Sequence, residues 1–192
     1  MARALKTKDH TRNEKTAAYN GFLDKDNESL GIFIPLPRHL ADQFSPKGPG
    51  EDPSPSHVTF LILGPCTESQ EHRRLLEVLG SFFRGWRPGA MAFQTGGLGY
   101  FDGEDGTVAY VQIVPPTALY SMREALIAEL QTAGLPVDLK FPEWVPHTTL
   151  GYLDSGEEWM GPVPEGEWQA SWLELWGCPK VYRLIPGQGL VF

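Results

Sequence analysis

Three things are scarce in this sequence: cysteine, basic residues and long apolar runs. The 192 residues include only two cysteines, Cys66 and Cys178, and each stands next to a proline. Two thiols cannot build a disulfide framework, and a zinc site would need further ligands. We therefore expect both cysteines to be reduced and structural.

The low content of basic residues argues against one class of partner. Sixteen Lys and Arg stand against 24 Asp and Glu, which gives a formal net charge of −8. Proteins that coat nucleic acid without sequence preference rely on clustered Lys and Arg, so that class is disfavoured, although a local positive pocket is not.

Apolar runs are short throughout. None approaches the ~20 residues that span a bilayer, and no apolar segment follows the basic N-terminus as it would in a secretory signal. We expect a cytoplasmic protein with no membrane partner.

The remaining composition is that of a folded domain. With 41% hydrophobic and 21% charged residues, the chain can form one sizeable core or at most two small ones. Residues 1–29 are polar and are expected to be a tail, whereas residues 30–192 are expected to form the domain. The proline-rich stretch 45–56 leads directly into His57 and should be a loop, either a lid or an inert connector.

Apolar periodicity and turn residues predict the order of the elements. Strands are expected over residues 30–36, 57–63, 91–101, 108–114 and 147–153, a last strand or broken pair over 181–185 and 190–192, and helices over 38–44, 68–84 and 117–132. The third and fourth strands should form a hairpin, with a bulge or bend at Gly96-Gly97. Residues 168–176 alternate, and their tryptophans are expected to serve the core rather than a ligand.

The most informative feature is a histidine motif that occurs twice. His57-Val58-Thr59 and His147-Thr148-Thr149 each begin a β-rich apolar run. Alternation along a strand places His57 with Thr59 on one face, and His147 with Thr149 on one face of the other strand. The opposite faces, which helices could cover, should carry Val58, Phe60 and Ile62 in the first strand and Thr148, Leu150 and Tyr152 in the second.

Both motifs follow a similar unit of strand, proline-started helix and strand. The unit 31–63 resembles the unit 108–153, down to the prolines at the end of each first strand. Two lobes related by approximate two-fold symmetry would bring the motifs face to face. We therefore predict an α+β fold with two pseudo-symmetric lobes, in which antiparallel sheets line a central cleft and the helices lie outside.

At these residues the chain resembles the 2H phosphoesterase superfamily. That superfamily includes RNA 2′,3′-cyclic phosphodiesterases (the so-called 2′-5′ RNA ligases), plant cyclic phosphodiesterases and phage enzymes that destroy cyclic oligonucleotide signals. The resemblance covers about residues 30–192 and is carried by His57-Val58-Thr59 and by Pro146-His147-Thr148-Thr149-Leu150. It implies a phosphodiesterase, and its phage-associated variants with Gly/Pro-rich loops suggest a viral or bacterial origin.

Two histidines and two threonines suit metal-free phosphodiester chemistry. One imidazole can deprotonate water or a 2′-hydroxyl while the other protonates the departing oxygen, since imidazole titrates at about 6.5. Thr59 and Thr149 would donate hydrogen bonds to the non-bridging oxygens. We predict catalytic roles for these threonines together with His57 and His147, and neither a metal nor a cofactor, because the acidic residues lack metal-ligand spacing. Which histidine is the base stays open.

Aromatic residues near the motifs are candidates for stacking a base. Tyr100 and Phe101 at the hairpin end and Trp144 just before the second motif are predicted substrate contacts, whereas strand parity places Tyr152 in the core. The expected substrate is a nucleotide, a cyclic nucleotide or a short RNA. Terminal 2′,3′-cyclic phosphates, 2′-5′ linkages, cyclic oligonucleotides and ADP-ribose cyclic phosphate all fit the same four groups.

Two other function classes compete with the enzyme. The chain could bind a nucleotide or cyclic dinucleotide without turning it over, or it could be a phage assembly component that keeps the fold for contacts. Two intact histidines favour turnover, because binding alone would not require both.

Overall fold

The structure is a computed structural model, and it describes residues 29–44, 56–65, 69–88, 91–103, 106–139, 143–177 and 181–191. The predicted tail (1–29) and the proline-rich stretch (45–56) lie outside these residues except for Ser29 and Ser56, and both cysteines lie outside them too. The division into tail and domain therefore stays a prediction.

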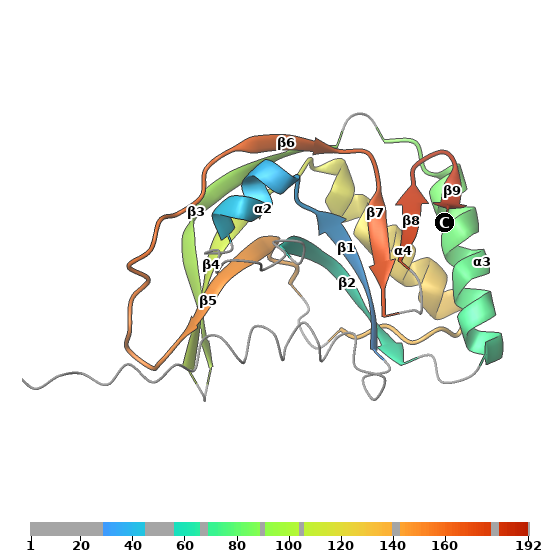
Figure 1. The fold of residues 1–192 in the computed structure, drawn as a ribbon. Coiled ribbons are helices and arrows are strands. Elements are labelled where there is room, and N and C mark those ends of the chain that lie inside the picture. Colours follow the sequence, from blue (N-terminus) through green and yellow to red (C-terminus); the bar gives the residue numbers. More distant parts are fainter. Residues whose placement is uncertain are drawn as a thin grey trace, which may run out of the picture.

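Two antiparallel sheets and three helices make up the described part of the chain (Figure 1). The five-stranded sheet has the order β2-β1-β7-β8-β9, from β1 (Ser29–Pro35), β2 (His57–Pro65), β7 (Leu173–Trp176), β8 (Tyr182–Ile185) and β9 (Gly189–Val191). The four-stranded sheet has the order β5-β4-β3-β6, from β3 (Met91–Gly103), β4 (Gly106–Val114), β5 (His147–Leu153) and β6 (Glu167–Ala170). The helices are α2 (Arg38–Phe44), α3 (Ser69–Gly85) and α4 (Ala118–Thr132). The predicted α+β class is confirmed.

Helix α4 shows how local sequence sets an element's end. Gly134 adopts a φ of +67°, which favours glycine. Its N–H donates to the Gln131 carbonyl, and the N–H of Leu135 donates to the Leu130 carbonyl, both at 2.9 Å. This is the Schellman pattern, and it terminates the helix with Leu130 and Leu135 both buried.

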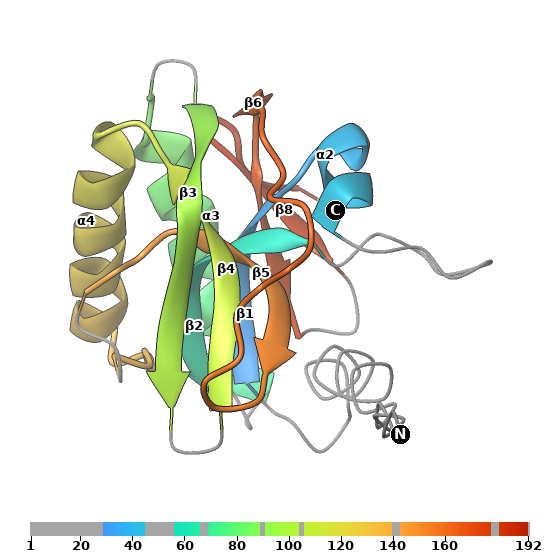
Figure 2. The same cartoon turned by 90° about the vertical axis from the view of Figure 1, so that its left-hand side faces the viewer.

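The helices occupy different sides of the molecule. Helices α3 and α4 contact one another, whereas α2 lies on the opposite side and contacts β5 (Figure 2). None of the helices among the described residues is both long and apolar enough to cross a membrane.

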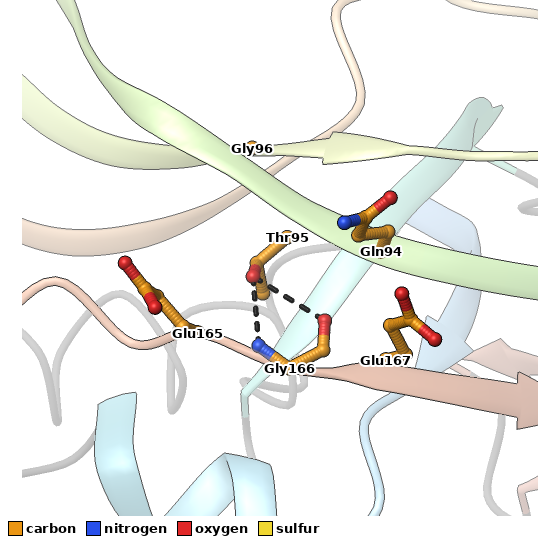
Figure 3. Close-up of a pocket in the computed structure, with 6 residues that line it drawn as sticks. All are labelled: Gln94, Thr95, Gly96, Glu165, Gly166 and Glu167. Atoms are coloured by element: carbon orange, nitrogen blue, oxygen red, sulfur yellow. Dashed lines mark hydrogen bonds between the residues drawn. The ribbon is translucent and has the colours of Figure 1, made fainter.

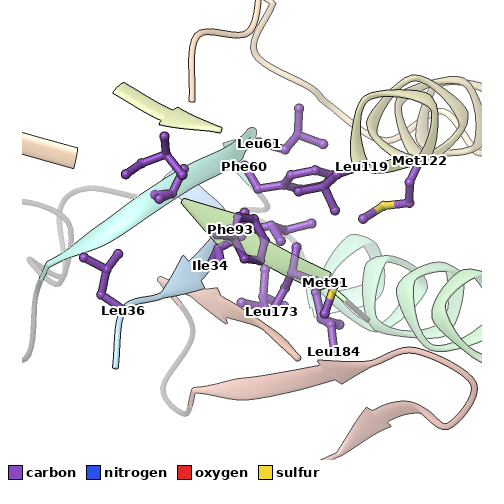
Figure 4. Close-up of a cluster of buried hydrophobic side chains, with 14 of the residues drawn as sticks. Ile34, Leu36, Phe60, Leu61, Met91, Phe93, Leu119, Met122, Leu173 and Leu184 are labelled. Carbon is purple, nitrogen blue, oxygen red and sulfur yellow. The ribbon is translucent and has the colours of Figure 1, made fainter. Parts of the chain in front are cut away.

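A single cluster of buried apolar side chains joins both sheets to the helices (Figure 4). It includes Phe60 of β2, Phe93 of β3, Leu119 of α4 and Leu173 of β7. Burying a large apolar side chain contributes about 1.5–3 kcal/mol, so this shared core fixes how the two sheets sit against each other.

The two repeat units fold as the sequence predicts. In each unit the first strand pairs antiparallel with the motif strand, β1 with β2 and β4 with β5. Each motif strand ends its own sheet, and the two end strands contact one another (Figures 1 and 2).

Both motif strands contain a bulge at the same place, which their alternating sequence does not predict. The register shifts directly after each threonine, so that the pairing skips one residue of the motif strand. In β2 the skipped residue is Phe60, which lies between the pairs Phe33↔Thr59 and Ile32↔Leu61. In β5 it is Leu150, which lies between the pairs Tyr110↔Thr149 and Ala109↔Gly151. A bulge reverses the alternation of faces beyond it.

Two face assignments are therefore wrong. Beyond the first bulge Leu61 and Leu63 are buried, and Ile62 is only partly buried. Beyond the second bulge Gly151 is buried and Tyr152 is 47% exposed, so Tyr152 does not pack in the core.

The segment 168–176 is not one alternating strand, contrary to expectation. It crosses between sheets, because β6 pairs with β3 whereas β7 pairs with β1. Trp168 stacks on Phe93 at 5.1 Å and is buried, as expected for core. Trp176 instead lies beside His57.

Candidate active site

Each histidine shares a face with its threonine, away from the core. On β2, His57 and Thr59 are partly buried while Val58 between them is fully buried. On β5, His147 and Thr149 are partly buried while Thr148 is 2% exposed. Because the faces alternate, both histidine–threonine pairs point to the side of their sheets that does not carry the main core.

Two aromatic rings from neighbouring strands flank His57. The ring of Phe33 (β1) lies 4.6 Å away, the ring of Trp176 (β7) lies 4.9 Å away, and these two rings are 4.5 Å apart, all measured between centroids. Phe33 is 1% exposed but does not belong to the main core cluster. We call His57, Thr59, Phe33 and Trp176 the His57 half-site.

His147 has a matching environment. The Phe101 ring (β3) lies 4.9 Å from the imidazole and the Tyr110 ring (β4) lies 5.2 Å from it. These two rings stack on one another at 4.2 Å with an interplanar angle of 21°. We call His147, Thr149, Tyr110 and Phe101 the His147 half-site.

Strand register shows that the two half-sites are built to one plan. In the strand next to each motif strand, Phe33 of β1 pairs with Thr59 and Tyr110 of β4 pairs with Thr149. Two residues earlier in β1 and β4, Gly31 pairs with Trp176 and Val108 pairs with Phe101. Phe33 thus corresponds to Tyr110, and Trp176 corresponds to Phe101.

One equivalent position differs in chemistry. Opposite Phe33 stands Glu174, whose carboxylate accepts the indole N–H groups of Trp172 (3.1 Å) and Trp176 (3.0 Å). Opposite Tyr110 stands Gly99, where an added Cβ would collide with the Tyr110 ring. The absence of a side chain at Gly99 lets Tyr110 lie across β3.

The protonation state of His147 is constrained by its surroundings. Its Nδ1–H donates to the Val145 carbonyl at 2.7 Å, because a carbonyl oxygen can only accept. Burial lowers the pKa of His147 below 6.5, and the bond to Val145 opposes this in part. The neutral ring therefore carries its free electron pair on Nε2.

Two of the three predicted substrate contacts lie away from this group. Tyr100 alternates with Phe101 and so points to the opposite face of β3, where its hydroxyl accepts the backbone N–H of Trp159 at 3.2 Å. Trp144 packs on Phe60, on the core face of β2, with ring centroids 5.3 Å apart. Of the three, only Phe101 is brought to a histidine.

A polar pocket of about 480 Å³ opens at the junction of β3 and β6 (Figure 3). Its lining residues are Gln94, Thr95, Gly96, Glu165, Gly166 and Glu167. The Thr95 hydroxyl accepts the N–H of Gly166 (2.9 Å) and donates to its carbonyl (3.3 Å), which holds the loop before β6 against β3. None of the predicted site residues lines this pocket. In the described residues no three His, Cys, Asp or Glu side chains gather in a way that could hold a metal ion.

The positions of Phe33, Tyr110 and Trp176 beside the histidines were not predicted from the sequence. Each lies on a neighbouring strand and reaches a histidine only through strand register, which a single sequence does not reveal. The signal that could have found two of them is the repeat itself, because Phe33 and Tyr110 hold equivalent places in its two copies.

Comparisons with known proteins agree with this architecture. A family model, the 2′-5′ RNA ligase superfamily, matches residues 38–169. A search of curated protein sequences gave no match. The crystal structure of TT0787 of Thermus thermophilus is 21% identical with a TM-score of 0.57, over 85% of this chain and 92% of that one. E. coli LigT complexed with 3′-AMP is 17% identical with a TM-score of 0.56, over 81% and 87%. At these identities the structural matches establish a shared fold.

Proposed function

This chain belongs to the 2′-5′ RNA ligase superfamily, a branch of the 2H phosphoesterases, and from that premise we propose that it hydrolyses cyclic phosphates or RNA-like phosphodiester bonds by two-histidine acid–base catalysis. Membership supports phosphodiesterase-type activity. The observation that carries the mechanism is the matched register of the two half-sites on end strands that contact one another.

His147 is the proposed general base. Its Nδ1–H is held by the Val145 carbonyl, so Nε2 is left to accept a proton, and burial keeps the ring neutral near pH 7 by lowering its pKa. His57 is then the general acid, because the reaction needs one neutral and one protonated imidazole.

The proposed hydrolysis of a cyclic phosphate breaks one ester bond and transfers two protons. A water oxygen attacks phosphorus as its proton passes to Nε2 of His147, one phosphorus–oxygen ester bond breaks, and the departing ribose oxygen takes a proton from His57. Thr59 and Thr149 donate hydrogen bonds to the non-bridging oxygens, whose charge grows in the transition state. Proton exchange with solvent restores both rings, and the product is a phosphomonoester.

A nucleotide phosphate is the proposed substrate class. LigT, which shares the fold, has been crystallised with 3′-AMP and with phosphate. Phe101, and by equivalence Trp176, offer aromatic rings beside the histidines on which a base could stack.

A substrate panel in EDTA tests the proposal. The panel holds a 2′,3′-cyclic nucleotide, a 2′-5′ dinucleotide, a cyclic oligonucleotide and ADP-ribose cyclic phosphate. We expect turnover of at least one member, and a loss of about 10²–10⁴-fold in kcat/KM for either His57→Ala or His147→Ala.

His39→Ala is the matched control, because His39 is an exposed histidine on α2. It should retain native activity. Activity that survives both motif substitutions, or that EDTA abolishes, would contradict the mechanism. Tight nucleotide binding without turnover would instead favour a protein that binds a nucleotide or cyclic dinucleotide and does not hydrolyse it.

A further inference from the structure

The outer edge of β2 is held by the other repeat unit. Strand β2 ends its sheet, so the next strand of the sheet lies on one side of it only. Three carbonyls of this strand, in and just after its motif, each accept a side-chain donor: His57 O from the Thr148 hydroxyl (3.2 Å), Thr59 O from the Trp144 indole N–H (2.8 Å) and Phe60 O from the Arg123 Nε–H (2.9 Å). All three donors lie in or directly before elements of the second unit, α4 and β5.

We propose that Thr148, Trp144 and Arg123 are positioning residues, which fix the backbone of His57 and Thr59 relative to His147. This inference rests on the proposed function, because it assigns these residues a role in that reaction. It also gives Trp144 a task other than the substrate contact predicted from the sequence.

Thr148 links the two motifs most directly. It stands between His147 and Thr149, is 2% exposed, and faces the core, where an apolar residue would ordinarily stand. Its hydroxyl donates to the backbone carbonyl of the opposite histidine. Thr148, which is adjacent to His147, therefore binds the backbone of His57 where the end strands β2 and β5 meet.

Trp144 and Arg123 form a rigid second hold. The Trp144 ring is packed against Phe60 at 5.3 Å and Tyr120 at 5.1 Å, and the Arg123 guanidinium lies 5.8 Å from its centroid. Arg123 is itself partly buried, which lowers its pKa. The two carbonyls that they bind, those of Thr59 and Phe60, lie at the bulge of β2. Because packing fixes the two donors, their hydrogen bonds restrain the backbone at this bulge.

The kinetic consequence follows from geometry. Displacing a catalytic group by about 1 Å can cost about 100-fold in rate, even when the change lies away from the chemistry. Loss of one hold should displace His57 by less than this. We expect a fall of about tenfold in kcat, with KM changed less than about twofold, since the substrate-binding groups remain.

The test compares variants that differ only in the donor. T148V removes the hydroxyl while keeping the shape, and T148S keeps the hydroxyl. W144F removes the indole N–H next to Thr59. W159F is the matched control, because the Trp159 indole also donates to a backbone carbonyl, that of Pro162 at 3.2 Å, away from β2.

Two readouts are needed: kcat and KM on the best panel substrate, and the NMR signal of the His57 ring in the free protein. Support requires that T148V and W144F lower kcat about tenfold and shift the His57 signal, while T148S recovers activity and W159F changes neither. A purely structural role would lower the melting temperature of T148V and W144F and leave kcat and the His57 signal unchanged, which would overturn the inference.

A failure of the proposed function can be distinguished from a failure of this inference. If the native protein turns over no panel member, the His57 signal alone decides whether Thr148 and Trp144 position that residue. Unchanged signals in T148V and W144F would then overturn it.

Discussion

The His57 half-site and the His147 half-site share one strand plan but differ in the residue that stands opposite the first aromatic ring. Both have a histidine and a threonine before a bulge, and both have two aromatic rings on the next two strands. Opposite the first ring of each half-site the chemistry differs: Glu174 stands opposite Phe33, whereas Gly99 stands opposite Tyr110. The comparison teaches that a symmetric scaffold can place two matching histidine–threonine pairs while the residues behind their aromatic rings differ in chemistry.

The largest expected effect tests the symmetric part of this comparison. Thr59→Val and Thr149→Val each remove a hydroxyl donor and keep the side-chain shape. Because both threonines hold equivalent places, each change should lower kcat/KM by about 10²–10³-fold, as the loss of one transition-state donor does elsewhere. Steady-state kinetics on the best panel substrate measures this. A large loss for one threonine alone would break the equivalence.

A smaller effect is expected where the half-sites differ in packing. Gly99→Ala would push a methyl group into the Tyr110 ring and should destabilise the fold by about 1–3 kcal/mol. Urea unfolding measures this free energy. Gly97→Ala on the same strand is the control, because an added Cβ there meets nothing within 4 Å. Equal stabilities for the two variants would show that Tyr110 does not need the glycine.

The counterpart change in the His57 half-site should be milder. Glu174→Gln leaves one acceptor oxygen where two indole N–H groups now bind, so either Trp172 or Trp176 loses its hydrogen bond to this side chain. The expected loss is about 1 kcal/mol of stability, discounted because Glu174 is partly exposed. Thermal unfolding, with tryptophan fluorescence for the ring environment, measures it. A stability equal to that of the native protein would indicate that the carboxylate is dispensable.

The smallest effect concerns pH and stability. The folded-state pKa of His147 lies below 6.5, so between that lower value and pH 6.5 the unfolded chain binds more protons. The stabilisation from a neutral His147 is therefore present above pH 6.5 and is lost as the pH falls through the folded-state pKa. Urea unfolding of the native protein and of His147→Asn across this range should show a shallower decline in the variant. Parallel curves would contradict the burial of His147.

The sequence predicted the fold because its strongest signals are local. Prolines and glycines such as Gly134 set the ends of helices, and the repeated unit around the two motifs predicted two similar lobes. Alternation from each histidine to its threonine also held, since no bulge intervenes between them.

What failed depended on pairing between distant strands. A bulge arises from register, so alternation could not place Ile62 or Tyr152. Trp176 joins its sheet by pairing with β1, which lies far from it in the sequence. Its position beside His57 could therefore not be predicted from the sequence alone. Trp144 precedes the His147 motif in the sequence, yet its indole N–H donates to the Thr59 carbonyl of the His57 motif.

The most direct measurement is the pH dependence of kcat/KM on a cyclic-phosphate substrate in EDTA. A neutral His147 and a protonated His57 predict a bell-shaped profile whose acidic limb has its midpoint below pH 6.5. A flat profile, or an acidic limb centred above pH 6.5, would contradict the assignment of opposite roles to the two half-sites.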